Sequence, residues 1–172
     1  LLDGGDNITR YVISGDSLLM INTNTYTYEG ETTTESDTIG LGFDGGKYPV
    51  RLHGGLMWGR YTYAADGRFL TAESGHGGFG NSWSKQTFSA EGPYQLLVKV
   101  EQYYNGALMS ESTYTYNEHG DQTGVVEGAF QGEYTGYVYD AQGNWTERMY
   151  RYKNGADWTT PEKETRQITY WD

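Results

Sequence analysis

The chain has 172 residues, with 17 Tyr, 5 Trp, no Cys and a formal net charge of −11. This length accommodates one domain with a core, and the many aromatic side chains supply apolar surface that disordered chains lack. The acidic balance argues against nucleic acid or anionic lipid as a partner, because both require a basic face. The sequence contains no run of about 18 apolar residues, so it predicts no transmembrane helix. The lack of Cys excludes disulfides and leaves the compartment undecided.

The glycines predict the fold class. There are 25 of them, mostly beside Asn, Asp or another Gly, which is typical of turns, and no stretch has the apolar spacing of an amphipathic helix. We therefore predict one all-β domain over residues 1–172, with roughly 10 to 13 strands. The expected architecture is an antiparallel meander of hairpins, either as one curled sheet or as two packed sheets. A weak division into two lobes is expected near residues 90–93.

Hairpins are expected at three points along the chain. Glu29-Gly30 separates two β-rich runs, and Asn105-Gly106 and Asn154-Gly155 carry the Asn-Gly pair that favours a two-residue hairpin turn. Between the first two turns, residues 92–104 (GPYQLLVKVEQYY) are the best candidate for a central strand, with Pro93 marking its entry.

One sequence unit occurs three times, in residues 59–74, 112–127 and 136–151. Each copy has Tyr-x-Tyr followed four residues later by Gly. The two rings share one face of a strand, Asn117 or Asp140 opens a type I turn by bonding forward to the backbone, and the Gly takes a left-handed conformation. The unit is predicted to be a hairpin. Its members are Tyr61, Tyr63 and Gly67; Tyr114, Tyr116 and Gly120; and Tyr137, Tyr139, Asp140 and Gly143.

This unit resembles the YD repeat of Rhs-type proteins, whose pattern is Arg-Tyr-x-Tyr-Asp-x-x-Gly-(Arg/Asn). The chain departs from it, since Ala64 replaces the Asp, Gly136 replaces the Arg and the copies are irregularly spaced. The resemblance implies a strand architecture rather than a function. The stretch after Gly143 is also similar to small secreted or lipid-anchored proteins of Bacteroidetes. That similarity implies a bacterial protein that is secreted, periplasmic or anchored to the outer membrane, with an export segment expected upstream of Leu1.

Tryptophan provides the best signal for a ligand. Exposed rings on a β surface can stack on the apolar faces of sugars, whereas the alternative is that Trp fills a core poor in Leu and Ile. The glycine-rich residues 74–84 are expected to form a flexible loop, because neither Lys-Ser/Thr nor a helix follows as in a phosphate-binding loop. The candidate ligand-binding residues in and around this loop and elsewhere are Trp58, His76, Phe79, Trp83 and Trp145.

Catalytic and metal chemistry have little support in the sequence. His53, His76 and His119 are too widely spaced for a typical metal site, and we expect no metal and no cofactor. No Gly-x-Ser-x-Gly motif is present, and the Asp-Gly runs lack the ligand pattern of a calcium loop. A glycoside hydrolase would need two carboxylates at a fixed separation, which the sequence cannot select among the acids. These acids include Glu29, Glu31, Glu35, Asp37, Glu101, Glu111, Glu127, Glu133 and Glu147.

The functional hypothesis from sequence is a non-catalytic, secreted or cell-envelope module that binds a polysaccharide or an envelope protein through a Tyr/Trp surface. One alternative is a purely structural repeat or spacer, for which the aromatic side chains would be mostly buried. A carboxylate-based glycoside hydrolase is the third alternative.

Overall fold

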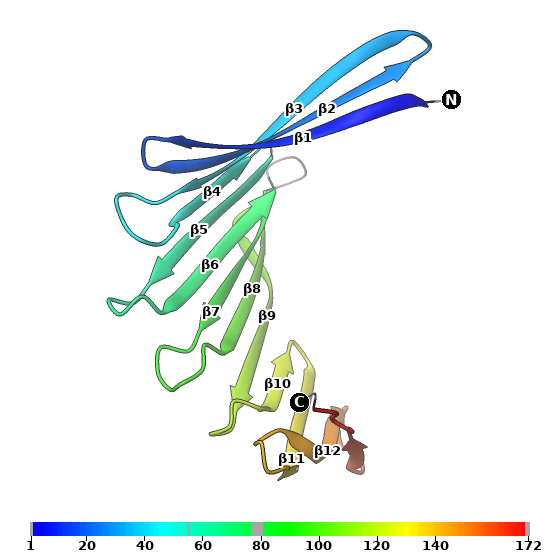
Figure 1. Cartoon of the computed structure of the whole chain (residues 1–172). Coiled ribbons are helices and arrows are strands. Elements are labelled where there is room, and N and C mark those ends of the chain that lie inside the picture. Colours follow the sequence, from blue (N-terminus) through cyan, green and yellow to red (C-terminus); the bar gives the residue numbers. More distant parts are fainter. Residues whose placement is uncertain (1, 55, 77–80, 171–172) are drawn as a thin grey trace. The chain divides into compact units, whose positions relative to one another are not determined.

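The computed structural model describes residues 2–54, 56–76 and 81–170, and this part of the chain is all-β (Figure 1). It contains no helix, and therefore no helix able to cross a membrane. The strands are β1 (Leu2–Ser14), β2 (Ser17–Tyr28), β3 (Glu31–Gly42), β4 (Arg51–Gly54), β5 (Met57–Tyr63), β6 (Phe69–His76), β7 (Ser82–Phe88), β8 (Leu97–Tyr104), β9 (Ala107–Tyr116), β10 (Gln122–Glu127), β11 (Phe130–Tyr139), β12 (Trp145–Asn154), β13 (Asp157–Trp158) and β14 (Glu162–Thr165).

The strands form one antiparallel sheet in which spatial order follows chain order from β1 to β13, while β14 pairs with β12. The predicted antiparallel meander is confirmed. The sheet is single and is not closed into a barrel, so the alternative of two packed sheets is not the one that forms. The strand count exceeds the expected range because β4, β13 and β14 have only two to four residues each.

Two of the predicted hairpin turns form as expected. Glu29 and Gly30 have φ values of 51° and 83° between the paired residues Tyr28 and Glu31. Asn105 and Gly106, with φ values of 49° and 79°, join β8 to β9 in the same way. Two successive positive φ values define the type I′ turn, whose twist matches that of the strands it connects.

The third turn lies one residue later than predicted. Asn154 is paired with Asp157 at the end of β12, so the turn residues are Gly155 and Ala156. Gly155 has φ 67° at the first central position, as a type II′ turn requires. Gly15 and Gly128 occupy the same position in the hairpins β1–β2 and β10–β11. Gly at the first central position supplies the positive φ there without strain, so Asn154 stays in the strand.

The repeated Tyr-x-Tyr unit forms the predicted turn in all three copies. The glycines Gly67, Gly120 and Gly143 have φ values of 87°, 83° and 83°. In each copy the Gly N–H donates to the carbonyl three residues earlier, over distances of 2.9 to 3.1 Å. The Asn117 side-chain oxygen accepts from the N–H groups of His119 and Asp121, and Asp140 accepts from Gln142 and Asn144 in the same way. These bonds confirm the forward-bonding side chain expected at both positions.

The copy with Ala64 obtains the same bond from a different residue. The Arg68 N–H, equivalent to the N–H groups of Asp121 and Asn144, donates to Asp66 Oδ1 over 3.1 Å. Arg68 Nε also donates to Asp66 Oδ2 over 2.7 Å. An acid two residues further along therefore replaces the side chain that Ala64 lacks.

The expected start of the central strand is wrong. Residues 89–96 form a loop, and β8 begins only at Leu97. Ser89 closes this loop, because its N–H donates to the Leu96 carbonyl and its hydroxyl bonds both the Tyr94 carbonyl and the Leu96 N–H. Gly92 has φ 88°, which no extended strand adopts. Side-chain capping by Ser89 thus takes the place of strand pairing before Leu97.

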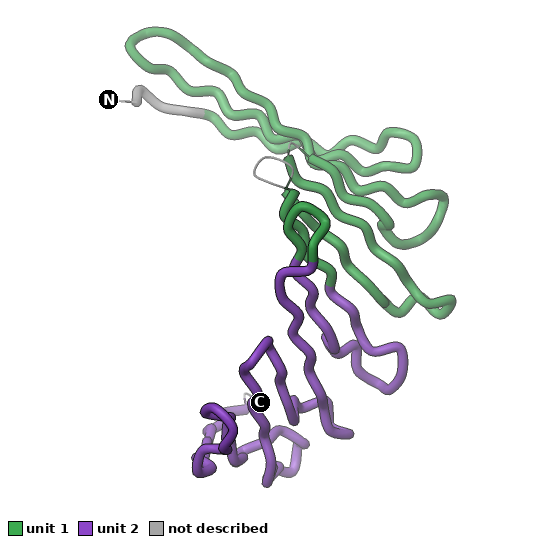
Figure 2. Tube along the Cα trace, turned by 180° about the vertical axis from the view of Figure 1, so that it is seen from behind, with its two compact units in different colours: residues 1–85, 103–107 green, residues 86–102, 108–172 purple. Residues whose placement is uncertain are grey.

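Contacts divide the chain into two compact units (Figure 2). Unit 1 comprises residues 1–85 and 103–107, and unit 2 comprises residues 86–102 and 108–172. The division suggested near residues 90–93 lies within unit 2, in the loop before β8.

The expected core is absent from the described residues, none of which is a buried hydrophobic residue. The buried positions are Ser112 and the glycines Gly40, Gly42, Gly59 and Gly132. Side chains from adjacent strands lie across these glycines. A Cβ on Gly40 would come within 2.0 Å of the His53 ring, and one on Gly132 within 3.2 Å of Tyr150 and Val125. Apolar area is thus covered locally on the sheet faces instead of in a central core.

Candidate functional site

Two tryptophans are brought together on one face of unit 1. The β5–β6 register pairs Trp58 with Gly75 and Arg60 with Glu73, so these four residues share a face. A Cβ on Gly75 would lie 2.7 Å from the Cβ of Trp83 and 2.8 Å from Nε1 of Trp58. Gly75 therefore provides the space in which side chains from β5 and β7 meet over β6.

The rings form an aromatic row. The Trp58 and Trp83 ring centroids are 6.2 Å apart with a tilt of 48°, while Trp83 and Tyr103 stack at 3.9 Å and 4°. Because Tyr103 covers one face of Trp83, the space next to Trp58 is where a further flat group can approach. That space is a groove of about 470 Å³ lined by Trp58, Arg60, Glu73 and Trp83, which we call the aromatic groove.

The groove also carries two charged groups available for a ligand. Arg60 and Glu73 are directly opposite across β5 and β6, yet neither takes part in an ion pair with any described residue. The Arg60 guanidinium lies 5.8 Å from the Trp58 ring. The aromatic groove thus combines ring faces with one multiple hydrogen-bond donor and one multiple acceptor.

A second hollow of about 340 Å³ adjoins the groove and shares Trp58 and Arg60 with it. Its remaining lining is Ser17, Gly42, Arg51, Leu52, His53 and Gly59. The positive charge of Arg51 is balanced by carboxylates, because its guanidinium contacts Asp44 and lies 3.9 Å from a carboxylate oxygen of Asp16. Arg60 is therefore the cation of this surface that lacks a carboxylate partner among the described residues.

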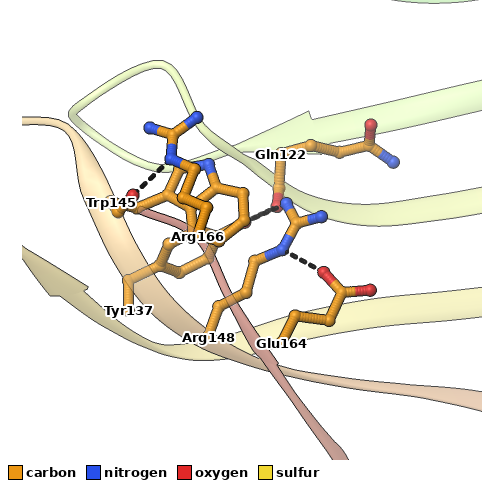
Figure 3. Close-up of polar contacts among 6 residues, drawn as sticks. All are labelled: Gln122, Tyr137, Trp145, Arg148, Glu164 and Arg166. Carbon is orange, nitrogen blue, oxygen red and sulfur yellow. Dashed lines mark hydrogen bonds and ion pairs between the residues drawn. The ribbon is translucent and has the colours of Figure 1, made fainter. Parts of the chain in front are cut away.

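Trp145 occupies a different environment in unit 2 (Figure 3). The guanidinium carbons of Arg148 and Arg166 lie 4.3 Å and 4.1 Å from its ring centroid. Arg148 Nε also donates to Glu164 over 2.6 Å, and Arg166 Nε donates to the Trp145 carbonyl. We call Trp145, Arg148, Glu164 and Arg166 the arginine–tryptophan cluster. It joins β12 to β14 and the chain beyond, and its groups are satisfied within the chain.

Tyr137 extends this cluster toward β10. Its hydroxyl donates to the Gln122 carbonyl (Figure 3), and burial raises the pKa of this hydroxyl above its ordinary value. The Tyr137 ring meets that of Trp145 edge-on at 6.4 Å. Tyr137 therefore helps to fix the orientation of Trp145.

The other ligand candidates from sequence lie elsewhere. His76 is paired with Met57 and so lies on the sheet face opposite to Trp58. Phe79 lies outside the described residues. Trp158, which was not among the candidate ligand-binding residues, packs under Arg151 and Lys153, with 4.9 Å and 5.6 Å to its ring centroid. The structure thus unites Trp58 and Trp83 and adds Arg60, Glu73 and Tyr103 to them.

The candidates for metal and acid chemistry are dispersed. No group of three or more His, Asp or Glu side chains suited to a metal ion exists among residues 2–54, 56–76 and 81–170. The His119 ring stacks on Tyr139 at 4.2 Å. Glu101 and Glu111 do approach one another, but Lys99 Nζ bridges them at 3.1 Å and 2.8 Å. The hydrogen bond to Glu111 is the largest cause of a raised pKa of Lys99, and the hydrogen bond to Glu101 raises it further.

Compared with known proteins, the chain matches no protein-family model and no curated protein sequence. The geometry of the aromatic groove is therefore the basis for assigning a function.

Proposed function

We propose that the protein is a non-catalytic module that binds a polysaccharide in the aromatic groove. One observation carries the proposal: two tryptophan rings converge beside Arg60 and Glu73, which lie opposite each other without forming an ion pair in the described chain. The rings can stack on the apolar C–H face of a sugar. Arg60 can donate to its hydroxyl oxygens and Glu73 can accept from its hydroxyl groups.

Charge favours a neutral polymer as the ligand. The chain carries a net charge of −11, which repels an anionic polysaccharide at long range. In the groove itself, Arg60 and Glu73 balance one another. Glu73 is the single carboxylate among the four lining residues, whereas glycoside hydrolysis uses a pair, so binding is proposed rather than cleavage.

We place this module outside the cytoplasm, as a secreted or envelope-associated bacterial protein. The support is the likeness of its turn units to YD repeats and of its C-terminal stretch to small exported proteins. An extracellular or periplasmic location would give the groove access to glycans.

The test is binding of the purified chain to an array of neutral and acidic glycans, followed by titration calorimetry with the best neutral polymer. Trp58→Ala and Trp83→Ala should each weaken binding at least about tenfold, as expected when a central aromatic anchor is removed. Glu73→Gln should weaken it by a smaller factor, because one charge-assisted acceptor is replaced by a neutral one.

Trp158→Ala is the matched control. It removes a half-buried tryptophan that also lies beside a guanidinium, but this tryptophan belongs to unit 2 and does not line the groove, so binding should be unchanged. Circular dichroism of each variant separates loss of binding from loss of fold. Equal binding by Trp58→Ala, Trp83→Ala and the parent chain would exclude the groove as the site.

A purely structural role is a second candidate, and the turn units favour it. A Cβ on Gly67 would lie 2.5 to 2.9 Å from the Tyr48 ring and hydroxyl, and one on Gly120 would lie 2.9 to 3.2 Å from the Tyr94 ring. The Tyr170 hydroxyl donates to Asp140 in the third turn. A tyrosine thus contacts each turn. This role predicts no saturable binding to any glycan, so the array separates the two candidates.

A further inference from the structure

The hollow beside the aromatic groove is lined by basic side chains. Arg51, His53 and Arg60 all contribute to it, and no Asp or Glu is found among the described residues that line it. The chain as a whole has a net charge of −11, so this local excess of basic groups runs against the composition. The hollow is therefore a place where an anionic group of a ligand can be held.

Strand register places the two arginines next to each other. The β4–β5 pairing sets Arg51 directly opposite Arg60. The neighbouring pair is hydrogen-bonded, because the Tyr61 N–H donates to the Val50 carbonyl over 2.9 Å. In an antiparallel ladder the next pair is then a non-hydrogen-bonded one, whose side chains lie closer together. Like charges directly opposite each other destabilise a sheet, so an anion bound beside them would relieve a repulsion.

The hollow is open because side chains of β4 lie over glycines of β3. A Cβ on Gly42 would lie 3.3 Å from Arg51 Nε, and one on Gly40 would lie 2.0 Å from the His53 ring. Arg51 and His53 thus lean toward β3 and away from Arg60 on β5. This leaves a space of about 340 Å³ in which Arg60 can meet a ligand.

Arg60 can serve the groove and the hollow with the same ligand. It lines both, as Trp58 does, and its guanidinium lies 5.8 Å from the Trp58 ring. A sugar stacked on Trp58 can therefore direct an exocyclic group toward Arg60. A guanidinium holds a carboxylate through two parallel charge-assisted hydrogen bonds. Arg51 contacts Asp44 and Asp16 through Nη2 alone, so its other guanidinium nitrogens can donate to the same carboxylate.

We propose that the hollow binds the carboxylate of a uronic acid residue in an otherwise neutral glycan, with Arg60 as the principal partner. This inference rests on the proposed function and specifies its ligand. A polymer with an acid on every sugar would be repelled by the net charge of the chain. A single acid at the hollow avoids most of that repulsion, because physiological salt screens charges more than about 8 Å away.

The test is an array that presents each neutral oligosaccharide beside the same oligosaccharide with one glucuronic acid residue, followed by titration calorimetry of the best pair. The acidic member should bind the parent chain at least about fivefold more tightly, because it adds charge-assisted hydrogen bonds. Raising NaCl from about 0.05 to 0.5 M should reduce this preference and change the affinity of the neutral member much less.

Three variants assign the preference to the hollow. Arg60→Gln should abolish it, so that the two members bind with equal affinity, although both bind less tightly than to the parent chain. Arg51→Gln should reduce it. Arg10→Gln is the matched control, because it removes the same charge from an exposed residue of unit 1 that does not line the hollow. It should leave the preference unchanged. Circular dichroism verifies that each variant is folded.

Two kinds of failure can be told apart. Equal affinity of the parent chain for both members, or a preference that Arg60→Gln retains, would overturn the carboxylate site and leave the groove as a glycan-binding surface. An equal loss of preference in Arg10→Gln would also overturn it, because the overall charge and not the hollow would then select the acid. Binding of no oligosaccharide on the array would overturn the proposed function as well.

Discussion

The aromatic groove of unit 1 and the arginine–tryptophan cluster of unit 2 are built from the same residue types. Both combine Trp, Arg and Glu on neighbouring strands. In the cluster, Arg148 reaches Glu164 over 2.6 Å and two guanidinium groups lie against the Trp145 ring. In the groove, Arg60 and Glu73 form no ion pair, and together with the two tryptophans they line an open space of about 470 Å³.

The difference shows that composition does not distinguish a structural cluster from a binding surface. What distinguishes them is whether the polar groups and ring faces are already used within the chain. A cluster whose polar groups bond to one another stabilises the fold. Polar groups without such partners, beside an exposed ring face, can instead form favourable interactions with a ligand. Five substitutions test the two units, and Trp58→Ala and Gly143→Ala serve among them as comparisons.

Trp145→Ala should have the largest effect on stability. Removing the ring abolishes two cation–π contacts and a packed side chain, which we expect to lower the free energy of unfolding by about 2–3 kcal/mol. Trp58→Ala, which opens an existing groove further, should cost about 1 kcal/mol or less. Urea unfolding followed by circular dichroism measures both. A greater loss for Trp58→Ala would reverse the assignment of structural and binding roles.

Gly75→Ala should have an intermediate effect that is specific to the groove. The added Cβ would lie 2.7 Å from Trp83 Cβ and 2.8 Å from the Ser82 carbonyl oxygen, so backbone has to move, at a cost of about 1–3 kcal/mol. Glycan affinity should fall as the rings separate.

Gly143→Ala is the control for Gly75→Ala. It places a Cβ in open space at φ +83°, which costs about 1–2 kcal/mol through backbone strain alone and should leave glycan affinity unchanged. Calorimetric titration of both variants makes the comparison. Undiminished affinity in Gly75→Ala would show that the groove does not depend on the close approach of Trp58 and Trp83.

Asp140→Asn should have the smallest effect, confined to acidic pH. The hydrogen bond from Tyr170, with backbone N–H groups of Asn144 and Gln142, lowers the pKa of Asp140. The stabilisation is therefore fully present above the ordinary aspartate pKa of about 3.9 and is lost as pH falls through the lower folded value. Asn keeps the acceptor oxygen, as Asn117 does in the second turn, but does not titrate. The urea concentration at the unfolding midpoint should therefore fall less steeply in Asp140→Asn than in the parent chain as the pH is lowered from about 6 to 2. An identical slope would mean that Asp140 titrates normally.

The turns could be predicted from sequence because their determinants are local. A Gly four residues after the second Tyr, with Asn117 or Asp140 to bond forward, defines the turn through contacts within five residues. Even the unit with Ala64 forms the turn, because Asp66 supplies the oxygen from within the same loop. The start of β8 could not be predicted because Ser89 closes a loop eight residues long, over which no single turn signal applies.

The groove could be predicted only in part. Trp58 and Trp83 were candidates by residue type, but Arg60, Glu73 and Tyr103 join them through strand register. The alternation in residues 58–60 places Trp58 and Arg60 on one face, which was the available signal. It could not show which residues of β6 or β8 would lie beside them.

By itself the sequence determined an all-β meander with its turns at the glycines, because backbone preferences and short-range hydrogen bonds act within a few residues. Only the tertiary structure decided which tryptophans have an exposed ring face and which are covered by guanidinium groups. It also decided that side chains cover glycines on the sheet faces and form no buried hydrophobic core among the described residues. The physical reason is that pairing register brings together residues distant in sequence, and whether a charge or a ring face is satisfied depends on those neighbours.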